Sequence, residues 1–188
     1  MALRVPKAEL PPELRETMIE RLGAVPENVE VLWHSPAVTQ DSLEFGGKVG
    51  AWDAADASLK SFANLAVAAQ VGCSWCLDFN YFEAHNKNLD MDKAREVPRW
   101  RESDAFSPLE REVLAYAEAM TVTEPTVTDD MVASLRTQLG DAALVELTAI
   151  IAFANLTTRS NVALGIESDG FAAACGLKPL AQPTAVLS

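Results

Sequence analysis

The chain has 188 residues, of which 49% are hydrophobic and 22% charged, a composition that predicts one folded domain and excludes a disordered chain. Fifteen Lys and Arg against 27 Asp and Glu give a formal net charge of −12. This charge repels phosphate backbones and anionic lipids, so we expect neither nucleic acid nor a membrane surface as a partner.

Helices are predicted from the beginning of the chain. Paired prolines start a helix over residues 11–22, and Gly23 ends it. An apolar segment follows over residues 29–33. Ser35-Pro36 then opens another helix, which the glycine pair at 46–47 is expected to weaken or bend.

Two helices are predicted to meet in the middle of the chain. Residues 56–71 are rich in alanine, and Gly72 follows as a C-terminal cap. The next helix begins directly with the sequence CSWCLDFNYFEAHNKN. Further on, the sequence Ser107-Pro108-Leu109-Glu110 matches a capping box with proline at the first helical position.

The last third of the chain is also predicted to be helical. Thr128 is expected to cap a helix that ends at Gly140, and Asp141 to cap a final long helix. No segment shows the alternation typical of a strand. The chain is therefore predicted to be an all-α, compact helical domain with short connections.

The predicted location is the cytoplasm. Residues 1–14 contain two acidic residues and no apolar core, so they do not resemble a signal or transit peptide. The most apolar stretch, residues 144–156, is shorter than a membrane span and contains Glu146 and Asn155.

The most informative motif is Cys73-Ser74-Trp75-Cys76. Cysteines at positions i and i+3 of a helix lie on neighbouring turns, close enough to form a disulfide after small adjustments. If Gly72 ends one helix, Cys73 begins the next, where unpaired N–H groups and the helix dipole favour a thiolate. The motif predicts either a redox-active pair or two buried cysteines that act as small hydrophobic residues.

No metal or cofactor is expected. A second CxxC is absent, and His34 and His85 are too scattered to complete a standard zinc spacing. The sequence also contains neither a dinucleotide-binding fingerprint nor a P-loop.

Residues 59–83, an Ala-rich helix followed by GCSWC and an aromatic-rich helix, resemble the core of the carboxymuconolactone decarboxylase / alkylhydroperoxidase D-like family. Residues 153–166 resemble its closing pattern. The resemblance implies one domain over 1–188, with a core of about 36–166, a helical lead-in and a tail of about 177–188. It also implies a homo-oligomer, either a trimer or a trimer-based hexamer.

The redox-active branch of this family implies roles for both cysteines. Cys76 would be the peroxidatic thiol that attacks a hydroperoxide, and Cys73 would resolve it as a disulfide. A thiol reductant or a protein electron donor would then restore the pair.

The sequence departs from that branch at its proton relay. Where the relay has a histidine four residues after the second cysteine, this chain has Asn80, and where it has a glutamate, this chain has Ser61. The amide of Asn80 is placed to hydrogen-bond a Cys76 thiolate, but it cannot accept a proton at pH 7. The usual general base is therefore missing.

Three nearby side chains are weak substitutes for that base. His85 projects from the face opposite Cys76, and Asp78 is more typical of a capping or solvated acid. Glu83 shares the face of Cys76 but lies about 10 Å further along the helix axis, so it would act only through Asn80 or water.

Other residues have mainly structural interpretations. The aromatic residues around the motif are typical of a core or an interface. Asn155 and Arg159 are expected to form an inter-helix hydrogen bond or to line a pocket. Cys175 is predicted to be a buried spectator.

Three functions remain open from the sequence. The first is a thiol-dependent peroxidase or disulfide oxidoreductase that uses Cys76 and Cys73. The second is a carboxymuconolactone decarboxylase-like enzyme, for which Arg159 would anchor a carboxylated substrate. The third is a non-catalytic helical oligomer that retains the cysteine pair.

Overall fold

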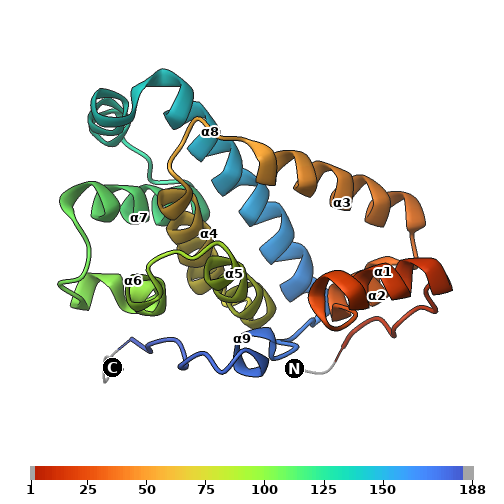
Figure 1. Ribbon diagram of the computed structural model, residues 1–188. Helices are drawn as coiled ribbons and strands as arrows, with labels where there is room; N and C mark the ends of the chain where they lie inside the picture. The colour runs from red at the N-terminus through yellow and green to blue at the C-terminus, as the bar shows by residue number, and fades with distance from the viewer. Residues whose placement is uncertain (1–2, 184–188) are drawn as a thin grey trace.

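The computed structural model describes residues 3–183, and these residues form helices and connecting loops without a strand. The all-α fold predicted from the sequence is therefore confirmed (Figure 1). The last part of the expected tail, residues 184–188, lies outside the described residues. The elements are, in chain order, α1 (Pro12–Leu22), α2 (Glu27–Leu32), α3 (Pro36–Ala51), α4 (Ala57–Val71), α5 (Ser74–Asn86), α6 (Met91–Glu96), the 3₁₀ helix η1 (Val97–Glu102), α7 (Pro108–Thr121), α8 (Asp129–Leu164) and α9 (Phe171–Ala174).

Several helix ends follow from their capping residues. The carboxylate of Asp56 accepts the backbone N–H groups of Ser58 and Leu59 at the start of α4. Gly72 ends this helix in the left-handed conformation, with φ 77°, which glycine adopts without strain. The capping box predicted at Ser107 and Glu110 is present at the start of α7.

Helix α4 forms the centre of the core. Phe62, Leu65 and Val67 are completely buried, and α4 packs against α5, α7 and α8 (Figure 1). Its small alanine side chains let these neighbours approach closely. The position of α4 matters for the site because the CxxC motif begins immediately after this helix.

Helix α3 corrects one expectation. It runs unbroken through Gly46 and Gly47 from Pro36 to Ala51. A Cβ atom on Gly46 would lie 3.4 Å from the ring of Phe153 on α8, an ordinary van der Waals contact, so the two helices lie close together here. Phe45 makes an edge-to-face contact with the same ring.

Helix α8 contains the two helices that the sequence predicted around Gly140. This glycine has non-helical angles, φ 80° and ψ 167°, and produces a kink within the 36-residue element. Thr128 caps its start through the N–H of Met131, as predicted. The carboxylate of Asp141 pairs instead with Arg136.

By length and apolar composition, α8 also resembles a membrane span. Its packing accounts for this composition, since Leu147, Ile150 and Ile151 are buried in the protein core.

Candidate redox site

The CxxC motif lies at the junction of α4 and α5. Cys73 is the N-cap of α5, and its sulfur accepts a hydrogen bond from the backbone N–H of Cys76 at 3.2 Å. The two cysteines form a disulfide across a Cα–Cα distance of 5.3 Å. The predicted proximity of the pair is therefore confirmed. The left-handed Gly72 ends α4, and the chain turns directly into a new helix that begins at the first cysteine.

Both cysteines are buried. Cys73 is 0% and Cys76 3% exposed, and Val31, Ala68 and Ile166 pack with them. An apolar environment disfavours a free thiolate, so any thiolate formed here depends on the hydrogen-bond donors within its reach.

One such donor is Asn161 on α8, which no motif in the sequence singles out. Its side-chain Nδ2 donates to the Cys76 sulfur at 3.4 Å, and the residue is only 3% exposed. The closing pattern over residues 153–166 contains this residue, but its spacing does not reveal which polar side chain meets the motif. A buried amide aimed at a sulfur is suited to stabilising negative charge on Cys76.

Asn80 has a different partner from the one expected. Its Nδ2 donates at 2.8 Å to the main-chain oxygen of Cys76, not to the sulfur. The residue four positions along a helix lies above that carbonyl, and a short amide side chain reaches it readily.

The positions of the missing relay nevertheless come together. Ser61, Asn80 and Glu83 line one hollow of about 520 Å³ beside α3 and α4. Neither cysteine is among its lining residues. Glu83 pairs with Lys87 at 3.8 Å, so its carboxylate is directed to a neighbour on its own helix.

Lys60, which lines this hollow, belongs to a well-satisfied ion pair. Lys60 donates to Glu146 at 2.9 Å, and the backbone N–H groups of Ala54 and Ala55 donate to the same carboxylate. Burial raises the pKa of Glu146, but these hydrogen bonds outweigh it and hold the pKa below its ordinary value.

Asp78 and His85 are confirmed as structural or surface residues. The carboxylate of Asp78 accepts the backbone N–H groups of Gly170, Phe171 and Ala172, which begin α9. His85 is exposed at the end of α5. Neither is a base for Cys76.

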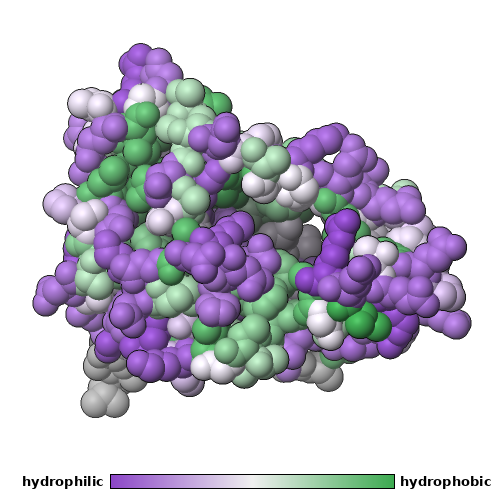
Figure 2. Space-filling view, in the orientation of Figure 1, coloured by the Kyte–Doolittle hydropathy of each residue, from purple (hydrophilic) through white to green (hydrophobic). Residues whose placement is uncertain are grey.

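A segment that we call the cover, residues 165–174, lies over the motif. Trp75 donates from its indole N–H to Asp169 at 2.7 Å, and the N–H of Ser168 donates to Ser74. Ile166 packs beside both cysteines. Figure 2 shows hydrophobic residues gathered on this face around α9.

The aromatic residues of the motif helix belong to this packing. Phe79 stacks on Trp75 with ring centroids 4.8 Å apart and meets Phe171 of α9 edge-on. Their predicted role in packing is therefore confirmed.

The N-terminal part of the chain fastens the cover. The N–H of Arg4 donates to the Leu164 carbonyl, and the N–H of Glu27 donates to Asp169. Val31 of α2 completes the apolar wall around the disulfide.

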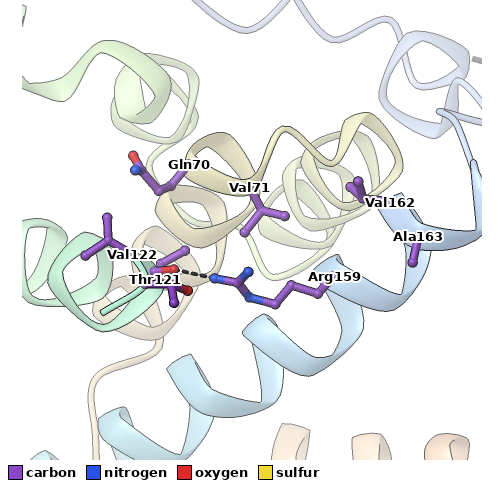
Figure 3. A pocket seen from close by; sticks show the side chains of 8 residues that line it. Gln70, Val71, Thr121, Val122, Arg159, Val162 and Ala163 are labelled. Carbon is purple, nitrogen blue, oxygen red and sulfur yellow. Dashed lines mark hydrogen bonds between the residues drawn. The ribbon is translucent and has the colours of Figure 1, made fainter. Parts of the chain in front are cut away.

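Arg159 lines another hollow, of about 610 Å³, on the α4, α7 and α8 side of the protein. Arg159 reaches from α8 and donates to the carbonyl of Thr121 (Figure 3). Its Nε donates to Asn155 on the same helix. Arg159 lines this hollow, so its predicted roles as an inter-helix donor and a pocket residue both apply.

The prediction for Cys175 is wrong. This cysteine is a free thiol and is exposed. Helix α9 has only four residues and buries Phe171, so Cys175 at its C-terminal end faces solvent.

Comparisons with known proteins give the fold a class. Solved structures that share it include a cysteine-to-alanine variant of the debrominase Bmp8 in complex with 2,3,4-tribromopyrrole. Its TM-score is 0.79 at 20% identity, over 93% of this chain and 96% of that one. Another is an alkylhydroperoxidase AhpD core, an uncharacterized peroxidase-related protein from Ralstonia eutropha JMP134. Its TM-score is 0.78 at 20% identity, over 90% of this chain and 94% of that one. The fold is therefore that of the AhpD-like proteins.

Part of the sequence also matches a family. Residues 36–119 match the carboxymuconolactone decarboxylase family, which confirms the resemblance seen in the motif. The uncharacterized protein YnjA of Escherichia coli (strain K12) is 36% identical over 115 residues, 61% of this chain and 63% of that protein. The match thus spans less than two thirds of the length of this relative.

Proposed function

We propose that this protein is a thiol-dependent oxidoreductase in which Cys73 and Cys76 alternate between a dithiol and a disulfide. The observation that carries the proposal is the buried disulfide at the start of α5, with the Asn161 amide directed at Cys76. The cysteines also lie inside the segment that matches the family.

With a hydroperoxide as oxidant, the reaction takes two steps. The Cys76 thiolate attacks the distal oxygen of ROOH, which breaks the O–O bond and leaves Cys76 as a sulfenic acid, while the RO⁻ released takes up a proton to form ROH. The Cys73 thiolate then attacks the Cys76 sulfur, and hydroxide leaves and is protonated to water. The sum is one dithiol plus ROOH giving one disulfide, ROH and water.

The site offers hydrogen-bond donors where the family relay offers a base. The N–H of Cys76 and the start of α5 stabilise negative charge on Cys73. Asn161 donates to Cys76. In the dithiol, a Cys73 thiolate would take the proton from Cys76, so that one proton is shared by the two sulfurs.

We choose the oxidants to be tested from the solved structures that share this fold. Structures with this fold include peroxidase-related proteins, which favours a hydroperoxide. The debrominase bound to a bromopyrrole makes such a compound the second probe, because a dithiol can also reduce a C–Br bond. That reaction converts R–Br and two thiols into R–H, a disulfide and HBr.

The test is turnover with dithiothreitol as reductant and either cumene hydroperoxide or 2,3,4-tribromopyrrole as oxidant. We expect consumption of one oxidant by the wild type, background rates for Cys76→Ser and Cys73→Ser, and full activity for Cys175→Ser as the matched control. Background rates for the wild type with both oxidants would contradict the proposal and favour a non-catalytic protein.

We further propose that copies of the chain associate in the cytoplasm, as a trimer or a trimer-based hexamer. Val38, Leu43 and Phe45 on α3 and Val145 and Leu156 on α8 are all exposed, between 42% and 69%. Exposed apolar side chains of this size favour an interface. Sedimentation equilibrium should give an oligomer at micromolar concentration, and a monomer would contradict this proposal.

A further inference from the structure

The groove around Arg159 is separate from the disulfide and has its own chemistry. The C-terminal end of α4 contributes Gln70 and Val71, the end of α7 contributes Thr121, and α8 contributes Arg159 and Val162. A second hollow of about 490 Å³ adjoins it and shares Arg159 with it. Figure 3 shows Arg159 extending from α8 toward Thr121, with Val71 of α4 across from it.

The lining of this groove is unusual for so acidic a protein. The chain carries a net charge of −12, yet neither hollow has an Asp or Glu among its lining residues. Arg159 is the charged residue that lines both. Glu124 lies next to the lining residue Thr123 in sequence, but its side chain is exposed and outside the lining.

Arg159 is held in place by neutral groups. Its guanidinium donates to the Thr121 carbonyl and to Asn155, and Asn155 in turn donates to the Thr121 hydroxyl. Arg95, Arg99 and Arg101, by contrast, each pair with a glutamate. Within residues 3–183 no ion pair joins Arg159 to a carboxylate, so its positive charge stays available in a fixed orientation.

We propose that this groove binds a small organic carboxylate. The carboxylate would accept hydrogen bonds from Arg159, whose planar guanidinium has donors beyond the two in use. The apolar body of the ligand would lie along Val71 and Val162. This inference goes beyond the proposed function, since it requires no chemistry at Cys76.

The groove lies next to the apolar residues that surround the redox site. Val162 lines the groove and also packs against the buried residues around Cys73 and Cys76. Val71 precedes Cys73 by two positions. A ligand in the groove would therefore contact α4 and α8, two of the helices that pack near the disulfide.

The test uses benzoate as the probe, with benzamide as its neutral counterpart, and saturation-transfer NMR or calorimetry on the disulfide form. We expect benzoate to bind in the millimolar range or tighter and benzamide at least about tenfold more weakly. Added salt should weaken benzoate binding. Equal binding of the two probes, or no binding of benzoate, would overturn the proposal.

Variants separate the groove from the overall charge of the protein. Arg159→Gln should lose benzoate binding and Arg159→Lys should retain part of it. Arg21→Gln, which makes the same charge change at an exposed position of α1, should bind like the wild type. Equal losses in the Arg159→Gln and Arg21→Gln variants would refute a specific site.

Two further variants complete the design. Glu124→Gln removes the neighbouring acid and should tighten binding of benzoate, and unchanged or weaker binding would count against the proposal. The Cys73→Ser/Cys76→Ser double variant should keep benzoate binding although it has no redox pair, so a failure of this proposal and a failure of the redox function are distinguishable.

Discussion

The side-chain amide of Asn161 donates to the sulfur of Cys76 from 85 residues further along the chain, at 3.4 Å. It joins the redox helix α5 to α8. It also places a neutral donor next to the sulfur that the family resemblance designates as the attacking thiol. Under the proposed function, the site would therefore depend on stabilising a thiolate more than on a dedicated base.

Asn161→Ala should slow the reaction of Cys76 in the reduced protein. A hydrogen bond to a charged group contributes about 1.5–3 kcal/mol, so the rate of alkylation by iodoacetamide should fall by roughly tenfold or more. Alkylation is measured by mass spectrometry in a Cys175→Ser background. Asn86→Ala, at an exposed position of α5, is the control and should leave the rate unchanged. Equal rates for all three proteins would show that the amide does not act on the thiolate.

Restoring the relay should change the pH profile of peroxide consumption. Ser61 and Asn80 line the same hollow, which offers about 520 Å³ for larger side chains. In a Ser61→Glu/Asn80→His variant, a histidine that titrates near pH 6.5 can accept the proton.

The activity of this variant should therefore reach its plateau at lower pH than that of the wild type, whose rate should keep rising until the Cys76 thiol itself is ionised. Ser61→Gln/Asn80→Gln is the matched control without a base. Superimposable profiles for the variant and the wild type would contradict this interpretation.

Loosening the cover should expose the disulfide. Trp75→Phe keeps an aromatic ring against Phe79 but removes the N–H that donates to Asp169. Reduction by dithiothreitol, followed as the appearance of thiols, should become several-fold faster, with a loss of stability of about 1 kcal/mol. Phe79→Leu reduces stacking but keeps that hydrogen bond, and it should change the reduction rate less. The reverse order would show that stacking, not the hydrogen bond, holds the cover.

The Lys60–Glu146 pair should contribute stability that depends on pH. The pKa of Glu146 is depressed in the folded protein, so its contribution is fully present above the ordinary glutamate pKa and is lost as the pH falls through the folded value. Glu146→Gln should lower the free energy of unfolding at pH 7 by about 1–3 kcal/mol. In urea titrations at a series of pH values, the difference from the wild type should narrow at acidic pH. A difference that stays constant down to about pH 3 would contradict the assignment.

The sequence predicts the local parts of the structure well and the long-range parts poorly. Asp56, Gly72 and Ser107 act within a few residues of themselves, so their patterns predict where α4 and α7 begin or end. The meeting of Asn161 with Cys76 depends on how α8 packs on α5, which no local spacing contains.

The two errors have different origins. Asn80 has two possible acceptors, the sulfur and the carbonyl of Cys76, and local helix geometry favours the carbonyl four residues back, which the prediction from the sequence passed over. Cys175 lies in an apolar stretch that predicts burial, but the short α9 that Asp78 caps turns it to solvent.

The most direct test of the redox account is a thiol count after a single oxidation. The fully reduced protein, with three cysteines, is mixed with one equivalent of cumene hydroperoxide, and free thiols and cumyl alcohol are measured. We predict that the count falls from three to one, that one alcohol forms per chain, and that peptide mapping finds Cys73 joined to Cys76. A count that stays at three, or oxidation confined to the exposed Cys175, would contradict the account.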